Sequence, residues 1–261
     1  MIDEIAQYVC SEGHVVAFTG AGMSVESGIA PFTGPGGLWR QYNPEEFAHI
    51  ETFRANPAKA WVLYKDLLNA VLPAQPHAGH YALSRLERRG VLQSVITQNV
   101  DGLHQKAGSE RVIEFHGDVK QLQCGRCAEC YDSMTHAWAH SPRCRCGGWL
   151  RPTFVLYGEP IPEEVLWAAE QAVLASRLLL VIGTACRVYP AALLPNLARR
   201  GGAKILEINA HERAVAGTEG WFLKGQAGPI LDTLCREIER QGQFEDAPVH
   251  PSSAADTPDL K

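Results

Sequence analysis

The chain has 261 residues, 46% of them hydrophobic, which is enough for one large domain or for a core domain with a smaller insert. Its 24 Lys and Arg residues against 29 Asp and Glu residues give a net charge of −5, so the basic excess typical of nucleic-acid-binding proteins is absent. No apolar run approaches the length of a membrane span, and the stretch MIDEIAQYVCSEG lacks a signal-peptide pattern, so we expect a soluble cytoplasmic protein with no nucleic-acid or membrane partner.

Four short apolar segments have the composition of buried parallel strands, and helical patterns alternate with them. The strands are expected at residues 15–18, 94–97, 178–183 and 203–209. The helical patterns cover residues 44–72, 78–89, 163–175 and 191–200. This alternation predicts an α/β fold with a doubly wound, Rossmann-like parallel sheet.

Each expected strand ends in glycine, hydroxyl or amide residues. The four ends read TGAG, TQNVDG, GTA and INA, in chain order. In an open parallel sheet, ligands bind at the carboxyl ends of the strands. The four ends together therefore predict a single binding cleft.

The first strand end carries half of a dinucleotide-binding fingerprint. Residues 20–22 (Gly-Ala-Gly) supply the first two glycines, but Val25 stands at the third glycine position. No clear acidic residue follows at a second strand end. Ser24, Glu26 and Ser27 are candidate caps for a helix whose N-terminus faces an anion.

Two segments interrupt the alternation and predict a smaller module beside the sheet. Residues 34–76 form a helical insert, and residues 118–150 hold a cysteine cluster. The Rossmann-like core would then comprise residues 1–33, 77–117 and 151–240. Residues 241–261, rich in Pro, Ser, Ala and Asp, are expected to be disordered.

The cysteine cluster indicates a metal site, because a disulfide framework would need a secreted protein. Two pairs supply four thiolates, which suit a tetrahedral structural zinc with no open position for water. The favoured ligands are Cys124 and Cys127 in CGRC and Cys144 and Cys146 in CRC. Cys130 offers an overlapping CAEC alternative. The remaining cysteines, Cys10, Cys186 and Cys235, are expected to be buried apolar residues.

Six separated motifs resemble, in order and rough spacing, those of the sirtuins, the NAD-dependent protein-lysine deacylases. They read GAGMSVESGIAPFTG (20–34), TQNVDGLHQKAG (97–108), EFHGDV (114–119), LRPTFVLYGE (150–159), GTACRVYP (183–190) and INAH (208–211). The resemblance covers about residues 2–240 and is to the prokaryotic type. It implies a Rossmann-like NAD-binding core, a zinc-binding small module and a deacylase activity.

The resemblance implies NAD-binding roles at all four strand ends. The residues expected around the diphosphate and the nicotinamide ribose are Gly20, Ala21, Gly22 and Ser24. Ile29 and Phe32 are expected to shield the nicotinamide pocket. Gln98 and Asn99 are expected to bind the ribose, and Asp101 is expected to bind the nicotinamide amide. Those expected at the adenosine half are Gly183, Thr184 and Asn209.

The resemblance also implies how an acyl-lysine protein or peptide binds and reacts. Val155, Leu156, Tyr157 and Gly158 would pair with the substrate backbone as an extended strand. The acetyl-lysine amide oxygen would displace nicotinamide from the ribose, and a ribose hydroxyl would then attack the adduct. The expected products are free lysine, nicotinamide and O-acetyl-ADP-ribose.

The ribose hydroxyl needs a base that works near neutral pH. Histidine suits this task because its ordinary pKa is about 6.5. We predict His116 as the base, in one catalytic site with Asn99 and Asp101. His80 and His104 are instead expected to have packing or hydrogen-bonding roles.

Two positions depart from the family pattern. Thr33 stands where the family has an arginine that contacts the cofactor, and Arg40 is a nearby cation that could compensate. Tyr64 matches the tyrosine of the branch that removes succinyl and malonyl groups, but Leu67 replaces the arginine that would bind the acyl carboxylate. We therefore predict neutral acyl substrates, acetyl first and longer fatty chains left open, that bind near Tyr64.

Three other activities could use the same parts. They are a mono-ADP-ribosyltransferase, an NAD hydrolase and a non-catalytic binder of NAD or acyl-lysine. His116 favours deacylation, because only that route must deprotonate the ribose hydroxyl. Thr33 is the one feature that favours the non-catalytic binder.

Overall fold

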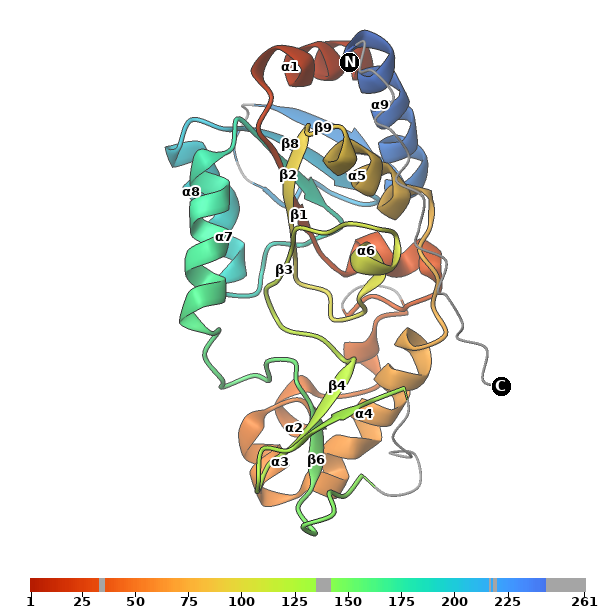
Figure 1. The fold of residues 1–261 in the computed structure, drawn as a ribbon, viewed down its shortest axis with the longest axis vertical. Coiled ribbons are helices and arrows are strands. Elements are labelled where there is room, and N and C mark those ends of the chain that lie inside the picture. Colours follow the sequence, from red (N-terminus) through yellow and green to blue (C-terminus); the bar gives the residue numbers. More distant parts are fainter. Residues whose placement is uncertain (33–35, 135–141, 216, 218–219, 243–261) are drawn as a thin grey trace, which may run out of the picture.

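The computed structural model of the chain describes residues 1–32, 36–134, 142–215, 217 and 220–242, and Figure 1 shows a parallel sheet above a smaller unit. The strands of this sheet are β1 (Val15–Thr19), β2 (Leu92–Thr97), β3 (Val112–Glu114), β7 (Leu178–Ile182), β8 (Lys204–Asn209) and β9 (Trp221–Lys224). They pair in parallel in the order β3-β2-β1-β7-β8-β9, which confirms the predicted doubly wound fold. The chain winds outward from β1 in both directions, so a ligand crevice is expected at the carboxyl ends of β1, β2 and β7.

Helices cover both faces of the sheet, which explains why the two middle strands, β1 and β7, are buried along their whole length. One face packs against α1 (Ile2–Glu12), α5 (Ala78–Arg88) and α9 (Ala227–Gly242) (Figure 1). The other face packs against α7 (Glu163–Ala175) and, after the short η3 (Ala191–Leu193), α8 (Leu194–Arg200). Within β1, Val15 and Ala17 join the first core, whereas Val16 and Phe18 join the second.

The smaller unit combines the helical and the cysteine-bearing segments around a third apolar core. Its helices are η2 (Leu38–Arg40), α2 (Pro44–Phe47), α3 (Ile50–Ala55) and α4 (Pro57–Val71). Its strands are β4 (Gln121–Cys124), β5 (Cys130–Asp132) and β6 (Leu150–Pro152), which form an antiparallel sheet in the order β5-β4-β6. Trp61 joins the two segments, because its indole Nε1 donates to the Leu150 carbonyl at 2.6 Å. The exact domain boundaries proposed from the sequence stay a prediction.

The helical pattern at residues 44–72 is three helices rather than one. The side chains of Asn43, His49 and Asn56 each accept a hydrogen bond from a backbone N–H in the first turn of the helix that follows. Pro44 and Pro57 stand at the first helical positions, where their missing N–H groups have no intrahelical partner to lose. These caps and prolines stop one helix and start the next.

Several elements fall outside the sequence prediction. They are α1, α9, the short α6 (Leu103–Lys106), and the edge strands β3 and β9. The edge strands are three and four residues long and only half-buried, so they lack an apolar run. Gln241 and Gly242 belong to α9, and the rest of the tail predicted to be disordered, residues 243–261, lies outside the described residues.

None of the helices in the described ranges is both long and apolar enough to cross a membrane.

Candidate active site

A cavity of about 1170 Å³ lies where the strand ends of the sheet meet the smaller unit. This volume exceeds the roughly 300–1,000 Å³ of common small-ligand sites, so an extended ligand fits. All four predicted strand ends contribute to its lining, which confirms the single cleft. The lining residues from these ends are Gly20, Ala21, Gly22, Gln98, Asn99, Val100, Gly183, Thr184, Ala185, Ile208, Asn209 and Ala210.

Gly20 and Gly22 are required by close contact between two loops of the sheet. A Cβ atom at Gly20 would lie 2.7 Å from the Thr184 Cβ, and one at Gly22 would lie 2.7 Å from the Gly183 Cα. Both distances are shorter than side chains tolerate, so any other residue would push the loops apart. The Gly22 N–H also donates to the Gly183 carbonyl at 2.8 Å. The glycines therefore join the β1 and β7 loops into one cavity floor.

Of the predicted caps Ser24, Glu26 and Ser27, none caps the N-terminus of its own segment, and only Glu26 caps a helix, α9. The segment after β1 is a short 3-10 helix, η1 (Ala21–Ser27), and no side chain caps its N-terminus. Glu26 instead accepts from the Gly228 N–H, 2.8 Å away in the first turn of α9. A carboxylate there complements the positive end of a long helix and ties α9 to the cavity wall.

Asn99 and Asp101 belong to one buried hydrogen-bond chain. The Asn99 side-chain amide donates to the Gly20 carbonyl and to the Ser24 hydroxyl, each at 3.0 Å. Ser24 donates in turn to the Asp101 carboxylate at 2.6 Å, and the Leu103 N–H donates to its other oxygen at 2.9 Å. Burial raises the pKa of Asp101, against the opposing effect of these two donors. The Asn99 side-chain oxygen is buried and has no partner among the described residues, so it is an acceptor for a ligand donor.

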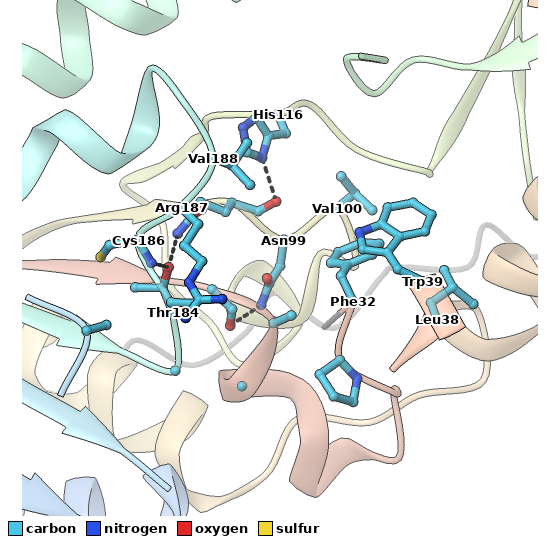
Figure 2. A pocket seen from close by; sticks show the side chains of 18 of the residues that line it. Phe32, Leu38, Trp39, Asn99, Val100, His116, Thr184, Cys186, Arg187 and Val188 are labelled. Atoms are coloured by element: carbon cyan, nitrogen blue, oxygen red, sulfur yellow. Dashed lines mark hydrogen bonds between the residues drawn. The ribbon is translucent and has the colours of Figure 1, made fainter. Parts of the chain in front are cut away.

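A smaller cavity of about 50 Å³ lies beside this chain. Ser24, Ile29, Phe32, Asn99 and Asp101 line it, together with apolar side chains of α4. The structure therefore brings together the residues expected around the nicotinamide. The Phe32 and Trp39 rings stack at 5.2 Å between centroids and form a wall of the main cavity opposite His116 (Figure 2).

His116 is held in one tautomer by the backbone of the β2 loop. Its Nδ1 lies 3.1 Å from the Gln98 carbonyl oxygen, which can only accept, so Nδ1 carries the proton (Figure 2). Burial lowers the pKa of His116, and the Gln98 carbonyl opposes this shift. The Gln98 side chain donates to the Thr184 hydroxyl at 2.9 Å. A neutral imidazole with a free Nε2 lone pair therefore lines the cavity.

The β7 and β8 loops form the end of the cavity expected to hold adenosine. The Asn209 side chain donates to the Thr184 carbonyl at 3.1 Å, which fixes the two loops together. Several residues that line this end of the cavity had no role predicted from the sequence, namely Arg187, His211, Arg213, Gly225 and Gln226. Arg187 belongs to the motif GTACRVYP (183–190), but its position in that motif did not predict a role.

The segment predicted to bind substrate lines the same cavity. Val155, Leu156, Tyr157 and Gly158 all contribute to the lining. The Val155 N–H donates to the His116 carbonyl at 2.8 Å, which places this segment directly beside the histidine. Tyr157 pairs with the smaller unit through an isolated parallel bridge to His49.

Tyr64 and Leu67 have different environments. Tyr64 is fully buried among the rings of Phe53, Trp61 and Phe154, and it does not line the main cavity. Burial raises the pKa of its hydroxyl, which has no hydrogen-bond partner among the described residues. Leu67, one helical turn away, lines both cavities.

The structure describes only one of the two positions discussed for contact with the charged part of the cofactor, Thr33 and Arg40. Thr33 lies outside the described residues. Arg40 is exposed at the end of η2 and is not among the residues lining either cavity.

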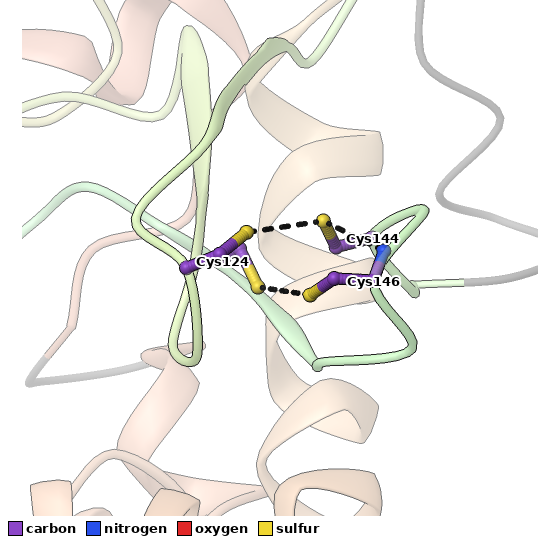
Figure 3. A group of neighbouring side chains, drawn as sticks. Cys124, Cys144 and Cys146 are labelled. Carbon is purple, nitrogen blue, oxygen red and sulfur yellow. Dashed lines mark hydrogen bonds between the residues drawn. The ribbon is translucent and has the colours of Figure 1, made fainter.

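The four predicted zinc ligands converge in the smaller unit (Figure 3). The Sγ atoms of Cys124, Cys127, Cys144 and Cys146 all lie within 4.8 Å of one another. Two of the Sγ pairs are 3.6 and 3.5 Å apart. A tetrahedral zinc with bonds of about 2.3 Å needs sulfur atoms about 3.8 Å apart, so the four thiols fit this ion.

Backbone donors and a glycine complete the zinc site. The N–H groups of Arg126, Cys146 and Gly148 point at ligand sulfurs over 3.3–3.4 Å, which stabilises thiolates. A Cβ atom at Gly148 would lie 2.7 Å from the Cys124 Sγ, so this position must be glycine. Cys130 is exposed and stands outside the cluster, which leaves it as a non-ligand.

The other cysteines divide by environment. Cys235 is buried as predicted, and Cys186 is half-buried at the cavity. Cys10 is exposed, so the prediction that it is buried is wrong. It lies at the edge of the contact between α1 and α9, where its thiol donates to the Ile238 carbonyl at 3.7 Å.

His80 and His104 are buried, as expected for packing residues. His104 Nε2 lies 3.0 Å from the Thr19 hydroxyl, and its ring lies 4.9 Å from that of His80. Burial, followed by neighbouring histidines, lowers the pKa of His80 to about 2 and that of His104 to about 3. Both rings are therefore neutral in the folded protein at ordinary pH.

Comparison with known proteins finds close relatives across nearly the whole chain. The Sir2 family model matches residues 20–190. NAD-dependent protein deacylase 2 of Pyrobaculum aerophilum is 45% identical over 91% of this chain and 96% of that protein. An NAD-dependent protein deacylase of Pyrococcus abyssi is 41% identical over 92% of this chain and 99% of that protein.

Solved structures show the same fold with ligands. A Sir2 homologue in complex with NAD is 38% identical with a TM-score of 0.85, over 92% of this chain and 94% of that one. A Sir2 protein with a deacetylated p53 peptide and 3'-O-acetyl ADP-ribose is 32% identical with a TM-score of 0.84, over 94% and 99%. Sir2Af2 bound to a myristoylated histone peptide is 34% identical with a TM-score of 0.79, over 94% and 98%.

Proposed function

Since the chain belongs to the Sir2 family and is an NAD-dependent protein deacylase, we propose that NAD binds across its strand ends and that His116 serves as the catalytic base. The observation that carries this proposal is the hydrogen bond from His116 Nδ1 to the Gln98 carbonyl. It leaves Nε2 as the nitrogen that accepts a proton. Since Val155 of the substrate segment bonds to the backbone of the same histidine, base and substrate would lie together.

The residues around the smaller cavity fit the nicotinamide end of NAD. The buried Asn99 oxygen lacks a donor, and a ribose hydroxyl or a nicotinamide amide supplies one. The Asp101 carboxylate is held by Ser24 and the Leu103 N–H, so it stays in place while it accepts from a ligand amide. When bound, NAD supplies the electrophilic ribose carbon from which nicotinamide departs.

His116 would then remove the proton from the ribose hydroxyl that attacks the acyl group. The Gln98 carbonyl disperses the positive charge that the ring acquires, because Nδ1–H donates to it. The Gln98 side chain bonds to Thr184, so the loop that holds the base is fixed against the β7 loop. The predicted roles of Gly183, Thr184 and Asn209 at the adenosine half fit their places in the cavity.

An apolar wall supports neutral acyl groups on the lysine of a protein or peptide substrate. Leu63, Leu67, Phe154 and Leu156 line the cavity on the side of the smaller unit, and none of them can pair with a carboxylate. A buried, unpaired carboxylate is costly, so succinyl and malonyl groups are disfavoured. The relative that binds a myristoylated peptide supports the inclusion of long fatty chains.

Mass spectrometry of an acetyl-lysine peptide, incubated with the protein with and without NAD, tests this proposal. We expect NAD-dependent loss of the acetyl group with formation of O-acetyl-ADP-ribose, and no product with His116→Ala. A succinyl peptide should react roughly 10- to 100-fold more slowly, because its carboxylate stays unpaired. Consumption of NAD with an intact acetyl peptide would instead indicate an ADP-ribosyltransferase or NAD hydrolase.

A further inference from the structure

Arg151 and Glu159 form a two-pronged ion pair at the base of the substrate segment. The guanidinium Nη1 and Nη2 lie 2.6 and 2.7 Å from the two carboxylate oxygens. The side chains are only 15% and 24% exposed, so solvent screens the pair weakly. This geometry is the fork-to-fork arrangement that fixes both side chains in direction as well as distance.

The same two side chains also hold the backbone between them. The Arg151 Nη2 donates to the Phe154 carbonyl at 2.8 Å. A Glu159 carboxylate oxygen accepts from the Leu156 N–H at 2.8 Å. The Glu159 N–H donates to the Leu156 carbonyl at 3.0 Å and closes the turn. The ion pair therefore fixes the path of the chain from Phe154 to Glu159.

Two backbone groups of this segment, both at the cavity, are not used by the ion pair or by the hydrogen bonds around it. The Val155 carbonyl and the Gly158 N–H make no hydrogen bond with any described residue, although their neighbours along the segment are bonded. Both residues line the main cavity. At Gly158, where φ is +82°, a Cβ atom would lie 2.6 Å from His49 Cε1, so this backbone conformation and this contact both require glycine.

On the basis of the proposed function, we propose that the Arg151–Glu159 pair is a positioning device for the acyl-lysine substrate. It holds the Val155 carbonyl and the Gly158 N–H as an acceptor and a donor for the amide groups of a bound peptide. Neither charged side chain bonds to His116, Asn99 or Asp101. The pair should therefore control peptide binding and leave the cofactor site and the chemical step largely unchanged.

Glu159→Ala removes the acceptor of the Leu156 N–H and leaves Arg151 unpaired, whereas Glu159→Gln retains an acceptor and the shape. We expect the Kd of an acetyl-lysine peptide, measured by fluorescence anisotropy with saturating ADP-ribose, to rise about 10- to 100-fold in Glu159→Ala. Glu159→Gln should recover most of that loss. In steady state, peptide KM should rise in parallel, while NAD KM and kcat stay within about threefold.

Glu239→Ala is the matched control, because Glu239 forms a similar two-pronged pair with Arg85 between α5 and α9, away from the cavity. It should lower the melting temperature without changing peptide affinity. Hydrogen exchange at residues 154–159 should accelerate in Glu159→Ala and not in the control. A folded Glu159→Ala protein with wild-type peptide affinity would overturn the inference, as would equal losses in both variants.

The wild-type arm separates this inference from the proposed function. If the wild type binds the peptide but does not deacylate it, the proposed function fails. The peptide Kd values of wild type and Glu159→Ala then still test the role of the Arg151–Glu159 pair. If the wild type does not bind the acetyl-lysine peptide at all, the inference fails.

Discussion

His116 Nδ1 and the Gln98 carbonyl oxygen are 3.1 Å apart, and this contact assigns the ring proton to Nδ1. The unprotonated Nε2 is then the nitrogen that can accept a proton. Burial lowers the pKa of the ring, so the neutral, active form persists to more acidic pH than in an exposed histidine.

The acid limb of the pH–rate profile should therefore lie below the ordinary histidine pKa of about 6.5. A plot of log kcat/KM against pH, with a peptide free of titrating side chains, measures it. His116→Ala should lower kcat by about 100-fold or more while it still binds NAD, measured by calorimetry. An acid limb centred above pH 7, or a variant with near-normal kcat, would refute the assignment.

His80 and His104 make the folded protein sensitive to mild acid. Their pKa values are about 2 and about 3 in the folded state, against about 6.5 when the chain is unfolded. Below pH 6.5 the unfolded chain binds protons that the folded chain does not, so stability must fall as pH decreases. Each ring contributes up to about 1.4 kcal/mol per pH unit in this range.

Urea unfolding at pH 7.5, 6.5, 5.5 and 4.5 tests this sensitivity. His80→Asn should be less stable at pH 7.5, because a large buried ring is lost, but its stability should decline less steeply with acid. An unchanged slope in the variant would mean that His80 is protonated in the folded protein.

The sequence predicted the elements that are continuously apolar or chemically distinctive. The four central strands appear within about two residues of their expected ends, since their mostly buried positions are apolar for three residues or more in a row. The strand ends and the four clustered cysteines were also found, because glycine, amide and thiol groups stand out from ordinary composition.

Other features depend on tertiary contacts that sequence patterns do not encode. The Tyr64 side chain is buried because three aromatic neighbours surround it: Phe53 of α3, Trp61 of α4, and Phe154, which directly precedes the substrate segment. Glu26 caps α9, two hundred residues away in the chain, rather than its own segment. Arg151 and Glu159 are eight residues apart, and the sequence does not show that the turn between them brings their side chains into an ion pair.

Loss of zinc should unfold the smaller unit. Cys144→Ser removes one of four ligands, and in small metal-dependent modules the ion contributes about 10–16 kcal/mol of folding free energy. We expect Cys144→Ser to lose bound zinc, measured by elemental mass spectrometry, and to lower Tm by roughly 10 °C or more. Cys130→Ser is the control, because Cys130 is exposed and outside the cluster. Equal zinc content in both variants would contradict this ligand set.

Arg187 should bind the diphosphate of NAD. It lines the cavity and makes no hydrogen bond or ion pair with any described residue, and Figure 2 shows its side chain extending into the cavity beside Thr184. Arg213, another cation of this lining, is already held by the Gly217 carbonyl at 3.2 Å and by the Phe222 ring. A free guanidinium pairs well with phosphate oxygens, so Arg187→Ala should raise NAD KM about tenfold or more and change kcat less.

Arg40→Ala separates the two arginines, because Arg40 is exposed and lines neither cavity. It should leave NAD KM within about twofold of the wild type, since it makes no contact at the cavity floor.

Calorimetry with ADP-ribose and with adenosine then shows which part of NAD Arg187 binds. Arg187→Ala should weaken ADP-ribose strongly and adenosine little, because adenosine lacks the charged groups. If Arg187→Ala instead raises peptide KM and leaves ADP-ribose affinity unchanged, the guanidinium serves the peptide side of the cleft. If Arg40→Ala alone weakens ADP-ribose, the cation for the diphosphate comes from the η2 segment.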